Sequence, residues 1–308
     1  MAALAILQTD SLATTEADKP VTRTLLAWLE SHSPLTQRSY GKTAGRFIQD
    51  IGGLASLKSV TPSAITAWLA KLKPTRGSSG QGRATEKISA STTNQRLAIL
   101  KSLFRALATE GITGNPAAFI KSKQATHKHH TALSVHRTLE GLAAIEKVND
   151  PVLRARNKAI ALLLLNNALR RSEISAIQIK GVKDGEIEIV GKGGKPARII
   201  LNKPTKAALE EWLRLRSSTS GALFVNFWHK RQGDAVTPVS IRKMTQKYFG
   251  CNPHQLRARS ITDLWERSGH NIGHAQAHAR HSSPAITERI YVQGRKVEEA
   301  ARYQPDYS

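Results

Sequence analysis

The sequence predicts a mainly α-helical chain with a small β-sheet, divided into two domains. Its length of 308 residues is typical of about two domains. Helical spacing of apolar residues prevails on both sides of a polar, basic and non-periodic segment at 121–131, and strand-type alternation marks one stretch of the second half. We therefore expect a loose tail at 1–20, a helical domain at 21–120, a linker at 121–131 and a second domain at 132–308.

The domain at 21–120 shows four helical patterns, each with its own start or stop signal. Glycines close the second and fourth patterns, because glycine readily adopts the left-handed conformation that ends a helix, and a Thr-Pro pair opens the third. The predicted helices are Thr22–Ser31, Thr36–Ile51, a helix that begins at Thr61-Pro62, and Thr92–Glu110.

A loop rich in glycine, serine and charge, Pro74–Ala90, connects the third and fourth predicted helices. Arg76 and Arg83 lie in this loop, and Arg96 lies early in the fourth helix. Cations on a protein surface bind phosphate groups, so we expect these arginines to contact a nucleic acid.

Composition agrees with a nucleic-acid partner. Lys and Arg number 46 against 23 Asp and Glu, and the net charge of +23 attracts polyanions. No stretch approaches the roughly 20 apolar residues of a membrane span, and the start lacks the pattern of a secretory signal. The single cysteine, Cys251, excludes an intramolecular disulfide and fits a reducing cytoplasm. The sequence contains no phosphate-binding loop of the Gly-x-x-x-x-Gly-Lys-Ser/Thr type, so nothing in it suggests the use of ATP.

The strand-type stretch predicts a β-hairpin with lysines at its tip. Glu186–Val190 alternates polar and apolar residues, Ala197–Leu201 is a second β-prone run, and Gly191-Lys192-Gly193-Gly194-Lys195 turns between them. Taken alone, the two lysines are better explained as residues that keep a turn soluble.

Three short motifs carry the residues that suggest chemistry. They are Asn167-Ala168-Leu169-Arg170-Arg171-Ser172-Glu173-Ile174, His254-Gln255-Leu256-Arg257, and Gln276 to His281 followed by Ser282-Ser283-Pro284 and Ile290-Tyr291. Two guanidinium groups can hold the non-bridging oxygens of a DNA phosphate, imidazoles can move protons, and a phenol can attack phosphorus. The constellation suggests phosphoryl transfer without a metal.

These motifs and the lysine hairpin resemble those of the tyrosine recombinase (phage integrase) family, over nearly the whole chain. The family counterparts are a Gly-Leu-Arg-x-Ser-Glu-Leu turn, His-x-Leu-Arg, a β-hairpin lysine, and a tyrosine after a histidine. The resemblance implies an N-terminal four-helix SAM-like core-binding domain at 21–120 and a C-terminal tyrosine-recombinase catalytic domain at 132–308. The linker would let the two domains clamp opposite faces of a duplex.

The resemblance also implies how the strand is broken. Tyr291 attacks the scissile phosphate and forms a 3′-phosphotyrosine bond, while Arg170, Arg257 and His281 hold the non-bridging oxygens. The phosphodiester energy is kept in this bond, so neither ATP nor Mg²⁺ nor another cofactor is expected.

Proton transfer falls, by the same resemblance, to His254 and a hairpin lysine. His254 takes the proton of the tyrosine and Lys192 protonates the leaving 5′ oxygen, with Lys195 as the reserve candidate. Glu173 is the supporting acid that orients an arginine. Without the family context, His254 and His281 would each be interpreted as a histidine of the core whose hydrogen bonds are satisfied.

The implied partners are double-stranded DNA and further copies of the chain. Lys195, Arg171 and Arg259 are expected to contact DNA beside the catalytic residues. Four protomers on two duplexes would exchange strands through a four-way junction, with an accessory DNA-bending or directionality protein as a possible helper. The expected setting is the cytoplasm, on the DNA of a bacterium, phage or other prokaryotic mobile element.

Several positions depart from the family pattern. They are Asn166-Asn167-Ala168 in place of a Thr-Gly pair, Ala258-Arg259 in place of a histidine and a small hydroxyl residue, His278-Ala279 in place of an apolar pair, and Arg280 in place of a glycine. These departures favour a second hypothesis, a non-catalytic DNA-binding or architectural protein that keeps the fold and the charge.

A zinc site is the alternative use of the histidines before the last motif. His270, His274 and His278 recur every four residues, so on a helix they would share one face. No nearby Cys, Asp or Glu completes a tetrahedral set, and His281 already belongs to the third motif. We therefore expect no metal site.

Overall fold

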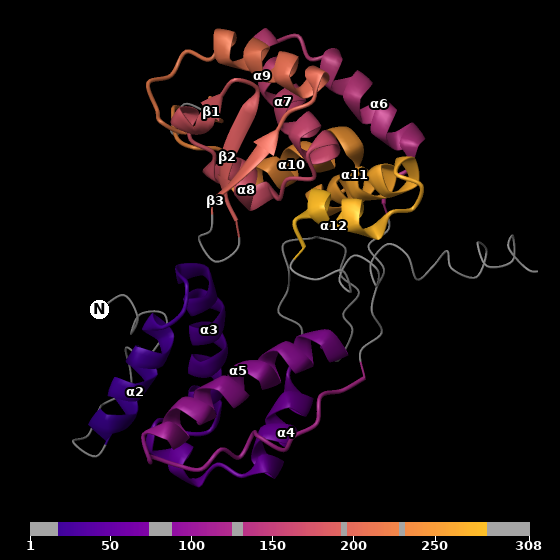
Figure 1. Cartoon of the computed structure of the whole chain (residues 1–308). Coiled ribbons are helices and arrows are strands. Elements are labelled where there is room, and N and C mark those ends of the chain that lie inside the picture. Colours follow the sequence, from indigo (N-terminus) through magenta and orange to yellow (C-terminus); the bar gives the residue numbers. More distant parts are fainter. Residues whose placement is uncertain (1–17, 74–87, 125–131, 192–195, 228–231, 282–308) are drawn as a thin grey trace, which may run out of the picture. The chain divides into compact units, whose positions relative to one another are not determined.

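The computed structural model describes residues 18–73, 88–124, 132–191, 196–227 and 232–281. These residues are mainly helical with one small antiparallel sheet, which confirms the predicted fold class at this level (Figure 1). The chain divides into two compact units, Met1–His127 and Lys128–Ser308, each with its own hydrophobic core. None of the helices in the described ranges has the length and apolar character needed to cross a bilayer.

The N-terminal unit is a helical bundle. Its elements are α2 (Lys19–Glu30), α3 (Pro34–Asp50), the short 3-10 helix η2 (Ala55–Ser59), α4 (Pro62–Lys71) and α5 (Ala90–Thr109). The α5 helix packs against α2, α3 and α4, and buries Leu100 and Phe104 against Leu25 and Phe47 from the first two of these. The four helices expected from the sequence are therefore present, while η2 was not predicted.

The C-terminal unit is built around a largely buried helix, α7, which contacts five of its other helices. Its helices are α6 (Val135–Glu146), α7 (Pro151–Asn166), α8 (Arg171–Ala176), η3 (Ile179–Gly181), α9 (Lys203–Leu215), α10 (Pro238–Phe249), α11 (Pro253–Arg267) and α12 (Ile272–Ala279). The apolar run at the end of α7 is the reason for its central place, because Leu163 and Leu164 are fully buried and α6, α9 and α11 all pack on this helix.

The sheet contains the predicted hairpin. Strands β2 (Glu186–Val190) and β3 (Pro196–Ile200) pair antiparallel, so that Ile187 lies opposite Ile199 (Figure 1). The alternation is as expected, since Ile187 and Ile189 are buried, Glu188 and Val190 are exposed, and Glu186 is half-buried. The tip of the hairpin, with Lys192 and Lys195, lies outside the described residues.

A third strand, β1 (Val182–Lys183), was not predicted. It pairs with β2 across the two-residue turn Asp184-Gly185, in which both residues have positive φ, 48° and 81°. This is the backbone that a tight two-residue hairpin requires, and Asp-Gly is one of its commonest sequences. The Asp-Gly turn signal was present in the sequence, but the strand that precedes it is only two residues long.

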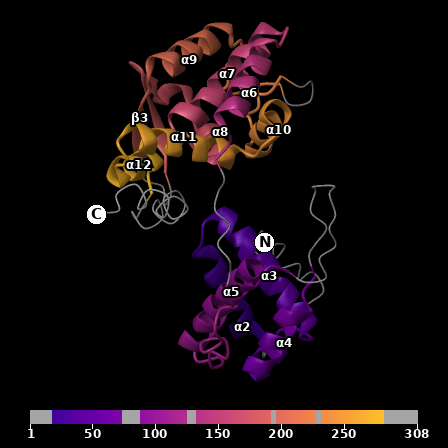
Figure 2. The same ribbon diagram turned by 90° about the vertical axis from the view of Figure 1, so that its right-hand side faces the viewer.

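The end of the described chain packs on the turn that follows α7. In both views α12 lies beside α11 (Figures 1 and 2). A small separate cluster joins these two helices to the turn, and its buried members are Ala168, Ile261, Trp265, Ala275 and Ala279. This packing brings the first motif, the second motif and the described part of the third, Gln276 to His281, to one place.

Gly141 provides a test of the packing between α6 and α10. A Cβ atom added at this position would lie 2.1 Å from a ring carbon of Phe249, which is buried. We predict that Gly141→Ala destabilises the C-terminal unit by about 1–3 kcal/mol, although alanine favours a helix. Urea unfolding should show the loss, and Gly221→Ala, which would meet only the movable amide tip of Gln178, is the control. Equal stability of both variants would contradict the packing.

Candidate active site

Arg170 stands at the start of α8, where a turn reverses the chain after the buried helix α7. The Leu169 amide donates to the Leu163 carbonyl, 3.2 Å away, and closes this turn. Ala168 within it has a positive φ of 48°, a conformation that glycine adopts more easily. The turn thus points the Ala168 carbonyl and the Arg170 side chain to the same region as the ends of α11 and α12.

Glu173 holds Arg170 by two hydrogen bonds. The Arg170 amide donates to Oε2 and the Arg170 Nη1 donates to Oε1, both at 2.7 Å. Burial by itself would raise the pKa of Glu173, but the hydrogen bond from the Arg170 amide and the charges of Arg280 and Arg170 outweigh it and lower the pKa. Glu173 is therefore a buried carboxylate that binds both the backbone and the side chain of Arg170.

Arg257 enters the same region from α11. This helix begins at Pro253 and is capped by Asn252, whose side chain accepts from the backbone of the first turn. The buried Arg257 guanidinium donates from Nη1 to the Ala168 carbonyl and from Nη2 to the Ala279 carbonyl. Arg257 therefore links the first motif to the end of α12.

His281 follows α12 and lies close to the arginines. Its amide donates to the Gln276 carbonyl and its carbonyl accepts from the Gln276 side chain, each at 3.2 Å. Burial, and then the charges of Arg257, Arg170 and Arg280, lower the pKa of His281 to about 4. The imidazole is consequently neutral near pH 7, and a neutral imidazole can still donate one hydrogen bond.

His254 lies on the first turn of α11, one turn before Arg257. It is exposed, and its amide donates to the Asn252 side chain at 3.0 Å. Partial positive charge at a helix N-terminus favours anions at this position. Arg170, Arg257, His281 and Glu173 are thus gathered in one site, with His254 on the same helix as one of them.

The remaining predicted site residues divide into two groups. Those outside the described residues are Tyr291, Lys192, Lys195, Arg76 and Arg83. Those inside are Arg171, Arg259 and Arg96. Arg171 is half-buried at the first position of α8.

Arg259 is buried on α11 and pairs with two carboxylates of its own helix. Its Nη2 contacts the Asp263 side chain and lies 3.1 Å from Glu266 Oε2. These ion pairs fix the direction of the Arg259 side chain, and its expected contact with DNA stays a prediction.

Arg96 lies in a groove of the N-terminal unit between α3 and α5. The groove also contains Lys42 and Arg46, and has a volume of about 200 Å³. Burial, and then the neighbouring charge of Arg46, lower the pKa of Arg96. Two arginines held this close make a favourable place for an anion.

Arg280 belongs to the site although the sequence presented it only as a departure. It ends α12 with a positive φ of 52°, and its Nη2 donates to Glu173 Oε2 and to the Ala168 carbonyl, both at 3.0 Å. The signal available in the sequence was a long, positively charged side chain at a position where the family pattern has glycine, next to His281 of the third motif.

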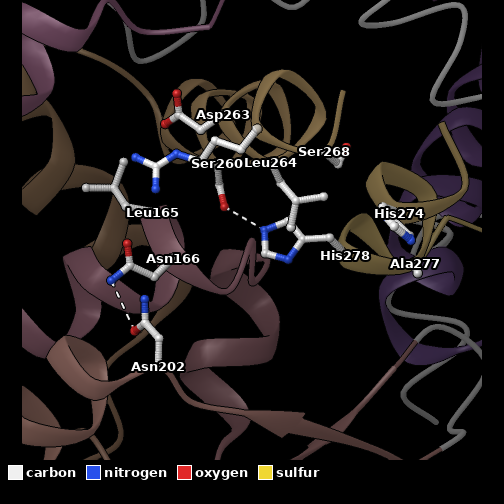
Figure 3. Close-up of a pocket in the computed structure, with 11 residues that line it drawn as sticks. Leu165, Asn166, Asn202, Ser260, Asp263, Leu264, Ser268, His274, Ala277 and His278 are labelled. Atoms are coloured by element: carbon white, nitrogen blue, oxygen red, sulfur yellow. Dashed lines mark hydrogen bonds between the residues drawn. The ribbon is translucent and has the colours of Figure 1, made fainter. Parts of the chain in front are cut away.

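A pocket of about 600 Å³ lies beside this site, between α7, α11 and α12. His278 points into it and shares a hydrogen bond of 2.8 Å with the Ser260 hydroxyl, while Asn166 and Asn202 meet on another wall (Figure 3). Burial, and then the charges of Arg280 and Arg257, lower the pKa of His278 to about 4.

His270, His274 and His278 do not share one face of a helix, as the alternative zinc site would require. His270 precedes α12, has a positive φ of 66° and packs on the Trp265 ring at 4.3 Å between centroids. Only His274 and His278 lie on the helix. Among the described residues, no group of three or more His, Cys, Asp or Glu side chains is placed to hold a metal.

Comparison with known proteins identifies the family. The family model for the phage integrase family matches residues 138–298, which include all three motifs and the lysine hairpin. The chain belongs to the phage integrase family. The resemblance seen in the motifs is thereby confirmed.

Curated relatives in this family are tyrosine recombinases. XerC of Pseudomonas fluorescens strain Pf-5 is 30% identical over 180 residues, which are 56% of this chain and 60% of that protein. XerC of Lactobacillus delbrueckii subsp. bulgaricus is 26% identical over 255 residues, which are 76% of this chain and 80% of that protein. The match thus spans less than two thirds of the length of the Pseudomonas relative.

Solved structures of the family share the fold. XerH site-specific recombinase, bound to its palindromic difH substrate in a post-cleavage complex, has a TM-score of 0.68 and 20% identity, with 98% of this chain and 93% of that chain covered. A lambda integrase dimer bound to a COC′ core site has a TM-score of 0.61 and 17% identity, with 88% and 96% covered. At these identities the likeness establishes the fold.

The two neutral histidines predict how stability depends on pH. An unfolded histidine has a pKa of about 6.5, whereas His278 and His281 have a pKa of about 4 in the folded protein. The unfolded state therefore binds more protons between these values, and the free energy of unfolding should fall as pH decreases from about 6.5 to about 4.

Urea unfolding at several pH values measures this slope. His278→Gln should flatten it, and His274→Gln, an exposed position on the same helix, should leave it unchanged. The same slope in His278→Gln as in the unmodified protein would refute the assignment.

Proposed function

We propose that this protein is a site-specific DNA recombinase that breaks and rejoins strands through a tyrosine nucleophile. The observation that carries the proposal is the convergence of Arg170, Arg257 and His281, which come from motifs far apart in the sequence: the charges of both arginines act on His281, and a buried carboxylate, Glu173, holds Arg170. Such a set of fixed hydrogen-bond donors suits a phosphoryl group whose negative charge develops in the transition state.

The proposed reaction begins with attack on a backbone phosphate. The Tyr291 oxygen forms a bond to phosphorus, the bond to the 5′ oxygen breaks, and a 3′-phosphotyrosine remains. Arg170 and Arg257 offset the charge of the non-bridging oxygens, and the neutral His281 donates a hydrogen bond to one of them. Guanidinium groups are well suited to this task because they stay charged and offer paired donors.

Two proton transfers accompany the attack. His254 accepts the proton of Tyr291, and Lys192 donates a proton to the departing 5′ oxygen. Without such help the phenol would react poorly, because its pKa of about 10 keeps it protonated near neutral pH. A 5′ hydroxyl from a partner strand then reverses the steps, so the reaction needs neither ATP nor a metal ion.

The N-terminal unit would serve as the core-binding domain of this enzyme. Its groove with Arg46 and Arg96 offers a place for backbone phosphates, and Arg76, Arg83 and Arg171 are further candidates for DNA contact. The net charge of +23 supports binding to a polyanion. The XerH and lambda integrase structures contain DNA sites, which supports the same partner here.

The proposed assembly is a homotetramer on two duplexes that exchanges strands through a Holliday junction. Integration, excision and dimer resolution all use such a junction. An accessory DNA-bending or directionality protein is compatible with this arrangement.

Loss of the nucleophile tests the central step. Nicked suicide duplexes built from the DNA that flanks the gene should form a covalent protein–DNA adduct, visible on denaturing gels. Tyr291→Phe should abolish the adduct while the duplex is still bound, and excess EDTA should leave adduct formation by the unmodified protein intact. An adduct that persists in Tyr291→Phe would show that Tyr291 is not the nucleophile. Tight binding of the unmodified protein without any adduct would favour the alternative of a non-catalytic architectural protein.

A modified substrate isolates the role of Lys192. A general acid contributes about 10²- to 10⁴-fold when the leaving group is poor. Lys192→Ala should therefore cleave a normal duplex slowly, but recover on a 5′-bridging phosphorothiolate, whose sulfur leaves without a proton. Arg170→Ala is the control that should recover much less, because its charge acts on the non-bridging oxygens. Equal recovery of both variants would remove Lys192 from this role and direct attention to Lys195.

A further inference from the structure

The Arg280 side chain folds back from the end of α12 onto the first motif. Its Nη1 donates to the carbonyls of Asn167 and His278, at 3.2 and 3.3 Å. Its Nη2 donates to the Ala168 carbonyl and to Glu173 Oε2, both at 3.0 Å. The left-handed backbone of Arg280 makes this return possible, because it reverses the chain where the helix ends.

Glu173 is therefore held on both of its oxygens. Oε1 accepts from the Arg170 guanidinium, while Oε2 accepts from the Arg170 amide and from Arg280. A carboxylate held by donors on both oxygens cannot rotate freely about its last bond. Because Arg170 Nη1 is bound to Oε1, the plane of the carboxylate also sets the direction of the Arg170 guanidinium.

We infer that Arg280 is a positioning residue of the recombination site: by holding Glu173 and the Ala168 turn, it aims Arg170 at the scissile phosphate. This rests on the proposed function, which assigns Arg170 to that phosphate. If Arg280 has this role, the arginine at the position where the family has glycine supports the site instead of weakening it.

The contacts distinguish this role from direct phosphate binding. Both terminal nitrogens of Arg280 are engaged by carbonyl or carboxylate oxygens of the protein, and the side chain is only 20% exposed. Arg170, at 32%, is more accessible. Arg280 thus lies behind Arg170, with Glu173 between them.

Substitutions at position 280 can distinguish an effect on the orientation of Arg170 from an effect on the stability of the fold. Arg280→Gly removes the side chain and suits the left-handed backbone, and Arg280→Lys keeps a charge that can reach Glu173. Arg216→Gln is the matched control, because the Arg216 guanidinium likewise binds backbone carbonyls, those of Ser220 and Ala222 at 2.5 and 2.7 Å, but belongs to none of the three motifs.

Three quantities are measured for each variant: the thermal unfolding midpoint, the affinity for the duplex by fluorescence anisotropy, and the single-turnover rate of adduct formation. Arg280→Gly should lose about 10- to 100-fold in rate, the usual effect of removing a group that orients a functional side chain. Its affinity should stay within about twofold, because the lost interaction acts on the transition state. Arg280→Lys should recover part of the rate, and Arg216→Gln should keep all of it.

Specific results would overturn the inference. An unchanged rate in Arg280→Gly removes the role altogether. A fall in affinity as large as the fall in rate would make Arg280 a phosphate ligand. A rate loss in Arg216→Gln of the same size would show that the loss of any guanidinium bound to backbone carbonyls harms the site through stability.

A measurement without DNA keeps this inference separate from the proposed function. The Nε–Hε resonance of Arg170, assigned with Arg170→Lys, reports how firmly its guanidinium is held. It should shift or broaden in Arg280→Gly and stay unchanged in Arg216→Gln. If the unmodified protein forms no adduct, the proposed function falls, and this resonance alone decides the role of Arg280: an unchanged signal in Arg280→Gly refutes it.

Discussion

The carbonyl oxygen of Ala168 is the point on which the site depends. It accepts from Arg257 on α11 and from Arg280 at the end of α12, so that one backbone atom joins elements that lie about a hundred residues apart in the sequence. The left-handed conformation of Ala168 turns the carbonyl toward both guanidinium groups. The small apolar cluster around Trp265 and the bonds of Arg280 to the Asn167 carbonyl and to Glu173 tie the same elements together.

The same geometry leaves the site with an excess of positive charge. Among the described residues, the guanidinium groups of Arg170 and Arg280 bind one carboxylate, Glu173, and their charges, together with that of Arg257, help burial to keep His281 neutral. Like charges held together without an anion repel one another, and the fold maintains them through backbone carbonyls and one buried acid. A bound phosphate would relieve this repulsion, which is the arrangement expected of a site organised before its ligand arrives.

The sequence predicted most of the helices, two of the strands and the motifs of the candidate site. It did not predict which side chains of these motifs contact one another. Proline, glycine and capping residues located the helices, and alternation located β2 and β3. Arg259 shows the limit, because nothing in the sequence indicated that its side chain pairs with Asp263 and Glu266 of the same helix. His270 was read as part of a helical face, but α12 begins two residues later.

These limits on what the sequence predicts have a common physical cause. Spacing along the chain predicts direction only where the helix bounds are known, and a shift of two residues moves a side chain by more than half a turn. Long-range contacts are harder still, because nothing local in the sequence says that Arg280 reaches Glu173.

The departures at positions 168 and 280 are best understood as one linked change. A non-glycine residue in the left-handed region costs about 1–2 kcal/mol, so two such residues without compensation would weaken the site. Here the side chain of the second binds the carbonyl of the first and also the buried acid, and a charge-assisted hydrogen bond contributes about 1.5–3 kcal/mol. The strain is offset by contacts that glycine could not make. The number of departures from a family pattern is therefore a poor measure of lost function, because two residues that each depart from it can support each other.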